Sequence, residues 1–230
     1  MRNLAKCVCV AMVASLWACG SPEQSAIDRF FRAGMTGDRS AKAAMSAVGA
    51  PAEVESWEMV EVRSRTVVPF EMPELTSKRK VAKKARDHQL DEGRQYLVAN
   101  REALDQIIPK LQEDEDFQFR GELGEIQTVW MKYARDRKVM EREYQDSVRA
   151  VDAELKLAAK SLLSEIPMET LEFFEGDVAV TEVLMSLDAA DADPKLYTVT
   201  LRKYEIHRPK SETVEPSRWI IVAVEEASPT

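Results

Sequence analysis

Thiol and imidazole side chains, on which much enzyme catalysis and metal binding depends, are scarce in this chain of 230 residues. The cysteines are Cys7, Cys9 and Cys19, and the histidines are His88 and His207. Two of the cysteines lie in an apolar N-terminal run, and the histidines are far apart in the sequence. The sequence also lacks the nucleophile-elbow, zinc-protease and phosphate-loop motifs. We therefore expect no catalytic site, no metal site and no cofactor, and we predict that the protein is not an enzyme.

Cys19 follows a short segment with the layout of an export signal. A basic head that contains Arg2 and Lys6 precedes an apolar stretch over residues 7–18. A resident transmembrane helix needs about 20 apolar residues, so this stretch is too short to span a bilayer. Its length suits the apolar core of a signal peptide instead.

The end of that stretch resembles the signal of a bacterial lipoprotein. Leu16, Ala18 and Cys19 match a Leu-x-small-Cys box, which is cut before a cysteine whose thiol receives a diacylglycerol. The resemblance implies a lipoprotein signal peptide over residues 1–18 and a membrane anchor of acyl chains such as palmitate on Cys19. The alternatives are an ordinary secretory signal, in which Cys19 is incidental, and a buried helix.

The anchor would also set the compartment. Gly20, rather than aspartate, follows the cysteine, and among lipoproteins this resemblance favours transfer to the outer membrane. We therefore expect the protein in the bacterial cell envelope, lipid-anchored in the outer membrane and facing the periplasm. Loss of residues 1–18 would change the formal net charge from −8 to −10. Such an acidic chain is a poor candidate for nucleic-acid binding.

Folded structure is predicted to begin directly after the cysteine. Ser21, Pro22 and Gln24 predict a helix start with a capping box. Apolar residues follow at helical spacing: they are Ile27, Phe30, Phe31 and Met35. Asp38 could be a pocket acid, but its place after a glycine favours a turn or the N-cap of a second short helix.

Strand-like segments flank the middle of the chain. Runs rich in β-branched and aromatic residues cover 54–70, 177–187, 195–207 and 217–227. Alternation of apolar and polar residues in the third run is typical of a sheet with one wet face. We expect these runs to form one small antiparallel sheet packed on the N-terminal helices.

The middle of the chain predicts a long antiparallel coiled-coil hairpin inserted into that base. A first series has leucine at every seventh position: Leu90, Leu97, Leu104 and Leu111. A second series has steps of mostly three and four: Leu123, Ile126, Trp130, Tyr133, Met140, Tyr144, Val151, Leu155 and Leu162. Arg94 and Arg101 fall near core positions of the first arm, so this arm would need another surface or a second copy to cover it.

The order of elements resembles the NTF2-like and cystatin-like α+β cone folds, especially small lipoproteins of the DUF4878 type. The residues that carry the resemblance are Ile27, Phe30, Phe31, Ala33, Gly37 and Asp38, in a helix and turn over 26–46. The expected fold class is α+β, a small cone with the hairpin inserted. The expected segments are a signal peptide (1–18), the N-terminal half of the base (19–75), the hairpin (76–163) and the C-terminal half of the base (164–230).

Two features of the hairpin are candidate binding sites. A dense basic run contains Lys78, Arg79, Lys80, Lys83, Lys84 and Arg86. It is either a solvated helix face or a contact for acidic lipids, a cell-wall polymer or an acidic protein. At the predicted tip, Phe117 and Phe119 lie among acidic residues. They either dock a partner or close the end of the hairpin.

Together these features predict a non-enzymatic envelope lipoprotein that acts as a binding or scaffold module. The hairpin would be its interaction arm, for a protein partner or for self-association. One alternative is a cone that carries a small apolar ligand or an enzymatic pocket, as in ketosteroid-isomerase-like proteins. A further alternative is a periplasmic adaptor-like subunit, although only one strand-like run precedes the hairpin.

Overall fold

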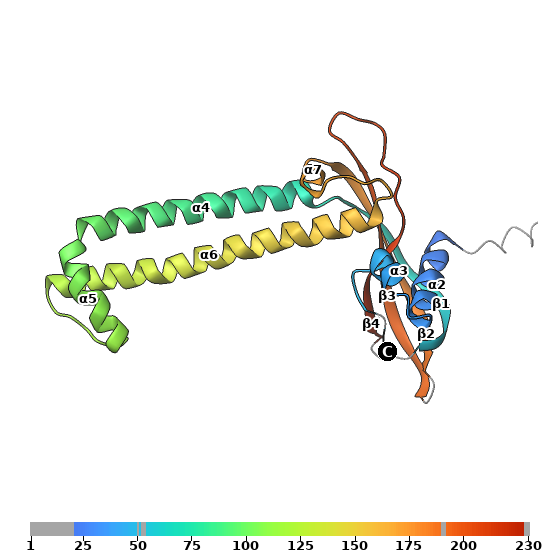
Figure 1. Cartoon of the computed structure of the whole chain (residues 1–230), viewed down its shortest axis with the longest axis horizontal. Coiled ribbons are helices and arrows are strands. Elements are labelled where there is room, and N and C mark those ends of the chain that lie inside the picture. The colour runs from blue at the N-terminus through green and yellow to red at the C-terminus, as the bar shows by residue number, and fades with distance from the viewer. Residues whose placement is uncertain (1–20, 50, 52–53, 190–191, 228–230) are drawn as a thin grey trace, which may run out of the picture. The chain divides into compact units, whose positions relative to one another are not determined.

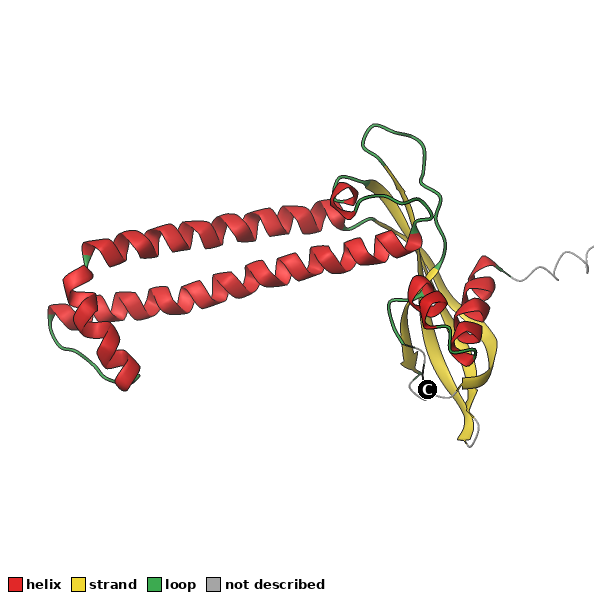
Figure 2. Ribbon diagram, in the orientation of Figure 1, coloured by secondary structure: helices red, strands yellow, loops and turns green. Residues whose placement is uncertain are grey.

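The structure is a computed structural model that describes residues 21–49, 51, 54–189 and 192–227. It is an α+β protein with a four-stranded antiparallel sheet (Figures 1 and 2). Its elements in chain order are α2 (Pro22–Met35), α3 (Arg39–Met45), β1 (Val54–Pro69), α4 (Met72–Ala99), α5 (Arg101–Glu113), α6 (Glu122–Ser161), α7 (Met168–Leu171), β2 (Glu175–Ala189), β3 (Ala192–His207) and β4 (Ile220–Glu226). The prediction of an α+β protein with an antiparallel sheet is confirmed.

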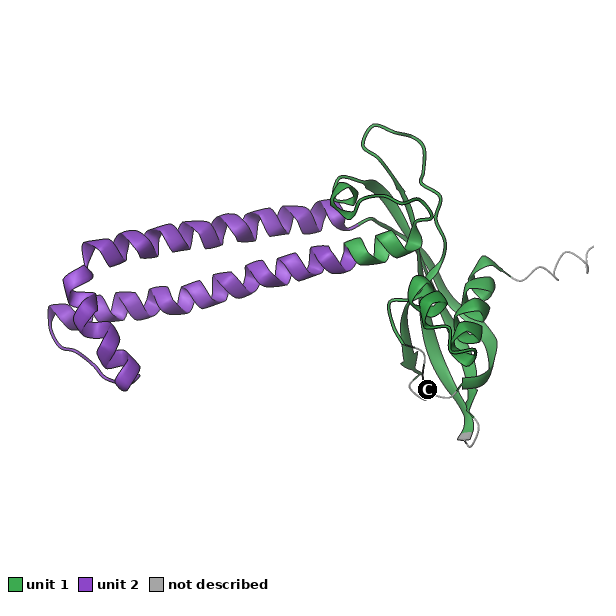
Figure 3. Ribbon diagram, viewed as in Figure 1, with its two compact units in different colours: residues 1–70, 155–230 green, residues 71–154 purple. Residues whose placement is uncertain are grey.

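The chain divides into two compact units (Figure 3). Unit 1 takes in the chain up to Phe70 and from Leu155 onward, and unit 2 is Glu71–Glu154. Because α6 crosses the second boundary, its last two turns belong to unit 1. Unit 2 therefore ends nine residues before the expected end of the hairpin at residue 163.

The sheet of unit 1 has the strand order β1-β2-β3-β4, with every neighbouring pair antiparallel. β1 and β2 pair along almost their whole length, from Val54 opposite Ala189 to Pro69 opposite Asp177. Along the sequence, the whole of unit 2 thus falls between β1 and β2, which are hydrogen-bonded neighbours in the sheet. The four strand-like runs of the sequence all appear here, and each strand starts and ends within three residues of its predicted bounds.

α2 packs on one face of this sheet. Its residues Ala26, Ile27, Phe30 and Phe31 form a core with side chains from β2, β3 and β4, and every member is at most 6% exposed. The ring of Phe31 stacks on Trp57 of β1 with centroids 5.3 Å apart. Burial of several large apolar side chains on one helix, each worth about 1.5–3 kcal/mol, stabilises this contact.

The start of α2 agrees in part with the predicted capping box. The hydroxyl of Ser21 accepts a hydrogen bond from the Gln24 backbone N–H at 3.1 Å, and a proline occupies the first turn. The Gln24 side chain does not complete the box, because its amide donates to Asp28 at 2.8 Å, one turn further on. Asp38 caps α3 by accepting from the Ala41 N–H at 2.9 Å, as the turn interpretation predicted.

The end of α6 is fixed within unit 1 by hydrogen bonds. The fully buried hydroxyl of Ser161 donates to the Arg218 carbonyl at 2.7 Å and accepts from the Tyr204 N–H at 3.1 Å. Lys160 donates to the Ser46 carbonyl at 3.0 Å, and Arg218 donates to the Ala44 carbonyl at 2.9 Å. Two cations therefore satisfy carbonyl groups at the C-terminal end of α3, where positive charge is favoured.

In unit 2, α4 and α6 run antiparallel (Figure 1). The rings of Tyr96 and Tyr133 lie 5.3 Å apart, and the Arg86 guanidinium lies over the ring of Tyr144 at 4.0 Å. From the first contact to the second, the residue number falls by ten on α4 and rises by eleven on α6, as antiparallel helices require. All nine residues of the second apolar series are buried or half-buried.

The first apolar series differs from its prediction. α4 ends at Ala99, with Asn100 as its C-cap, between Leu97 and Leu104, and Leu97 is 40% exposed while Leu104 is buried in α5. A row of mixed polar and apolar residues with steps of four and three is half-buried: Leu75, Arg79, Ala82, Arg86, Gln89, Gly93, Tyr96 and Asn100. The large ring of Tyr96 packs on Tyr133, which leaves Leu97 on the flank. The leucine series is therefore not one continuous seam.

Candidate interaction surfaces

The proposed anchor cannot be placed on this fold. Cys19 and the expected signal peptide, residues 1–18, lie outside the described residues. Within the described part of the chain, no helix has the length and apolar character needed to cross a bilayer. The same residues contain no group of three or more histidine, cysteine, aspartate or glutamate side chains arranged to hold a metal ion.

The basic run occupies the first half of α4, in unit 2. Part of it is neutralised within the helix. Lys78 pairs with Glu74 at 2.6 Å, and Lys83 pairs with Asp87 at 3.2 Å. The hydrogen bond from Lys78 lowers the pKa of Glu74, and the same bond raises the pKa of Lys78. These are exposed pairs one helical turn apart, which stabilise a helix only weakly.

Other members of the run have different surroundings. Arg86 donates to Asp87 at 2.7 Å, and this hydrogen bond lowers the pKa of the Asp87 carboxyl. Arg79 is half-buried in the row that faces α6. Lys80 and Lys84 are exposed, and neither has an ion pair within 4.0 Å among the described residues. The run therefore combines two solvated lysines with residues that serve the helix itself.

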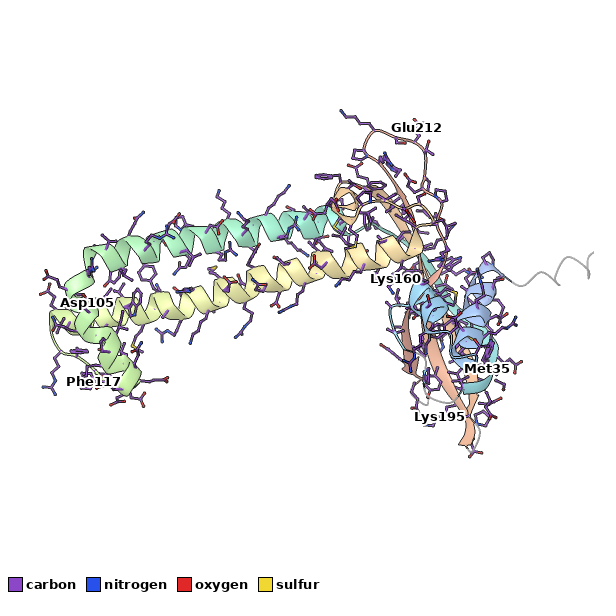
Figure 4. All side chains as sticks on the ribbon, in the orientation of Figure 1. Met35, Asp105, Phe117, Lys160, Lys195 and Glu212 are labelled. Carbon is purple, nitrogen blue, oxygen red and sulfur yellow. The ribbon has the colours of Figure 1, made fainter. Side chains whose placement is uncertain are left out.

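Phe117 and Phe119 lie in the loop between α5 and α6 (Figure 4 labels Phe117). Their rings make an edge-to-face contact with centroids 4.9 Å apart. Phe119 is half-buried and Phe117 is 38% exposed. The two rings thus pack against each other, and the ring of Phe117 remains partly exposed. The pair therefore has features of a cap that closes the hairpin and of a site that docks a partner.

The backbone of that loop is held by Gln127, which is not among the candidate residues of the sequence analysis. Gln127 is only 4% exposed, and its side-chain carbonyl accepts from the Phe119 N–H at 2.9 Å while its amide donates to the Phe117 carbonyl. Gly124 allows the loop to approach α6, because a Cβ at this position would lie 2.5 Å from the Phe119 carbonyl oxygen. An interior glutamine that follows an aromatic loop is the only local sequence signal for this arrangement.

Several clefts lie along unit 2. One of them, which we call the elbow cleft, has a volume of about 500 Å³ where α4 meets α5 and α6 begins. Its lining combines apolar and charged side chains: Val98, Ala99, Asn100, Arg101, Glu102, Ala103, Gln106, Glu122, Leu123 and Ile126. A second cleft of about 340 Å³ lies between α4 and α6 and includes Gln89, Tyr133 and Asp136.

The region where a cone would hold a ligand is filled by side chains in unit 1. The described face of the sheet under α2 is covered by Ile27, Phe30 and Phe31. Two acids on α2 have partners on β1. The carboxylate oxygen Oε1 of Glu23 lies 3.5 Å from Nε of Arg65, and Asp28 accepts from the indole N–H of Trp57 at 2.9 Å. These carboxylates serve packing contacts between α2 and β1.

Unit 2 therefore offers the clearest surfaces for binding: exposed lysines on α4, one exposed phenylalanine and the elbow cleft. The sequence identified the first two, whereas the cleft depends on the break at Asn100 and on contacts between distant segments. We compared the chain with protein-family models, curated proteins and solved structures, and none of the three comparisons found a match.

Proposed function

We propose that this chain is a lipid-anchored protein of the bacterial cell envelope that works as a binding or scaffold module without catalysis. Acylated Cys19 would hold it in the outer membrane, facing the periplasm. Unit 2 would be the interaction arm, and unit 1 would be the folded base that carries it. The observation that supports the arm most directly is the incomplete burial within unit 2.

Incomplete burial is visible along both long helices. Of the 28 residues of α4, Met72 is the only one that is fully buried. Large apolar side chains remain exposed on both helices: Val81, Leu97 and Val98 on α4, and Val129, Met131 and Val139 on α6. A helix pair that faces only water normally places such residues in its seam. Contiguous exposed apolar patches mark binding surfaces, and we infer that some of these side chains belong to such a patch.

The finer description of the fold is part of the same proposal. We propose that unit 1 is an NTF2-like or cystatin-like base and that unit 2 is an antiparallel hairpin of coiled-coil type inserted between β1 and β2. The support is the order of elements, in which α2 and α3 precede a meander and α2 covers one face of its sheet. The steps of three and four on both helices support the hairpin.

The anchor is tested by replacing the acceptor thiol. A Cys19→Ser variant should leave the membrane fraction and lose metabolic palmitate labelling, because diacylglycerol attaches to the thiol. An Ala18→Ser variant, which keeps both the cysteine and a small residue before it, is the matched control and should fractionate with wild type. Equal sedimentation of the Cys19→Ser variant and absence of label on wild type would refute the anchor.

The arm is tested by removing it. Residues 73–153 are replaced by a flexible Gly-Ser linker of about ten residues, which keeps Leu155, Ser161 and Leu162 in unit 1. The shortened chain should remain folded and lose the proteins that crosslink to wild type in intact cells. Circular dichroism of the β-sheet reports whether unit 1 is intact in the shortened chain. Unchanged crosslinks would refute the role of unit 2.

A further inference from the structure

We propose that the partner of unit 2 is unit 2 of a second copy, and that the two pair antiparallel about a twofold axis. The basic segment of one α4, residues 78–86, would dock at the elbow cleft of the other copy. The inference rests on the proposed function of unit 2 as the interaction arm and names the partner of that arm. It depends on two observations within unit 2: the distribution of charge and the lining of the cleft.

Opposite charges are separated along unit 2. Residues 78–86 contain six cations and no acid, whereas residues 101–125 contain eight acids and three cations. All eight acids are exposed: Glu102, Asp105, Glu113, Asp114, Glu115, Asp116, Glu122 and Glu125. Figure 4 labels Asp105, on α5, among these side chains.

The two charged segments cannot neutralise each other within one copy. Ala82, in the middle of the basic segment, and Asn100, at the elbow, are about 27 Å apart along α4 at 1.5 Å per residue. This separation is several times the screening length of about 8 Å at physiological ionic strength. An antiparallel pair about a twofold axis brings each basic segment to the acidic elbow of the other copy, and both contacts form at once.

The elbow cleft fits the basic segment in chemistry as well as in sign. Val98, Leu123 and Ile126 give the cleft an apolar lining, and Glu102 and Glu122 place carboxylates in the same lining. The segment that would enter it has Val81 67% exposed, with the exposed Lys80 and Lys84 on either side in sequence. An apolar side chain flanked in sequence by two lysines matches a cleft that combines apolar side chains with two glutamates, although Arg101 also lines it.

A charge-swap experiment tests the pairing with the full-length chain purified in detergent. Sedimentation velocity measures the dimer for wild type, for Lys80→Glu/Lys84→Glu and for Glu102→Lys/Glu122→Lys. Wild type should dimerise, with an affinity that falls as salt is raised, because the contacts are charged. Each double variant should bind itself at least about tenfold more weakly, because like charges then face each other. An equimolar mixture of the two double variants should recover dimers, since reversed segments meet opposite charges again.

A matched control changes the same net charge elsewhere. Lys156→Glu/Lys210→Glu alters two exposed lysines of unit 1 and should dimerise as wild type does.

The outcomes separate this inference from the function on which it rests. A wild-type chain that stays monomeric, or a mixture of charge variants that does not recover dimers, overturns the pairing of copies. If crosslinks to another protein then still require residues 73–153, the arm is retained with a different partner. If wild type dimerises and the chain without residues 73–153 dimerises equally well, the pairing through unit 2 is refuted, and the arm is refuted as well if that chain also keeps every crosslink of wild type.

Discussion

Unit 1 and unit 2 differ in how they use their apolar residues. In unit 1, one helix and a four-stranded sheet enclose a core in which every residue of the cluster is at most 6% exposed. In unit 2, two long helices contact each other through tyrosine rings and an arginine, and several valines remain in solvent. The first arrangement encloses a core of its own, although valines of β1 remain exposed, whereas the second leaves both long helices largely without buried side chains. We therefore expect substitutions in the two units to have effects of different size, and in one case of opposite sign.

The largest effect is expected from the core of unit 1. Phe30→Ala should lower the free energy of unfolding by about 3–5 kcal/mol, because it leaves a cavity among fully buried side chains. Leu97→Ala on α4 is the comparison and should cost less than about 1 kcal/mol, since that side chain is 40% exposed. Urea unfolding monitored by circular dichroism measures both. Equal losses would show that unit 2 is as well packed as unit 1.

The next effect comes from the hydroxyl that fixes the end of α6. Ser161→Ala should lower the free energy of unfolding by about 1–3 kcal/mol, because the Tyr204 N–H loses its acceptor in a buried site. Ser64→Ala is the matched control. Its hydroxyl bonds an exposed Glu182, and its loss should change stability by no more than about 0.5 kcal/mol. A Ser161→Ala variant with the same free energy of unfolding as wild type would contradict this account of the end of α6.

Glycine substitutions sharpen the comparison, because the same change should have opposite signs in the two units. Gly176→Ala in unit 1 should destabilise by more than about 1 kcal/mol: φ is +136° and the new Cβ would lie 2.4 Å from the Glu205 carbonyl oxygen. Gly93→Ala in unit 2 should stabilise by about 0.5–1 kcal/mol, because alanine favours the helix and space is open. Thermal unfolding measures both. Destabilisation by Gly93→Ala would mean that other atoms already occupy the space beside Gly93.

A smaller and more local effect is expected at the loop between α5 and α6. Gln127→Ala removes the acceptor of the Phe119 N–H and should cost about 1 kcal/mol, with faster hydrogen exchange at that amide. Gln145→Ala, whose side chain bonds Glu141 on an exposed face, should leave exchange in the loop unchanged. Slow exchange at Phe119 in the Gln127→Ala variant would show that other contacts hold the loop.

The smallest effect is a pH dependence on the exposed face of α4. The hydrogen bond from Lys78 lowers the pKa of Glu74 in the folded chain. A depressed carboxyl pKa contributes stability above the pKa of the unfolded chain, and this contribution is lost as pH falls through the folded value. Lys78→Gln should raise the pKa of Glu74 toward its ordinary value, as measured by NMR titration. An unchanged pKa would show that solvent already screens the pair.

The base of the protein could be predicted well from the sequence because its signals are local. Alternation and β-branched residues predict the strands, and Ser21 and Asp38 lie at helix starts where their side chains bond nearby backbone groups. The second apolar series also predicts the buried side of α6. These inferences need only residues within a turn or a strand of one another.

The rest depends on contacts that local patterns do not report. Tyr96 competes with Leu97 for the side of α4 that faces α6, and only the partner ring of Tyr133 decides which of them packs. Ser161 and Lys160 bond carbonyl groups more than 50 and 110 positions away in the chain. The elbow cleft requires the helix break at Asn100, where neither glycine nor proline announces a stop.

The pairing of β1 with β2 across an inserted unit has a consequence for how the chain acquires its fold. β1 would emerge from synthesis or export long before its neighbour, with Val60, Val62, Val67 and Val68 all exposed even in the finished strand. Closing so long a loop is slow for an unstructured chain. Helices form in about a microsecond and return the chain toward its start, so early folding of α4 and α6 shortens the effective loop. Variants that weaken these helices should thus delay sheet assembly and prolong the interval in which β1 is prone to aggregate.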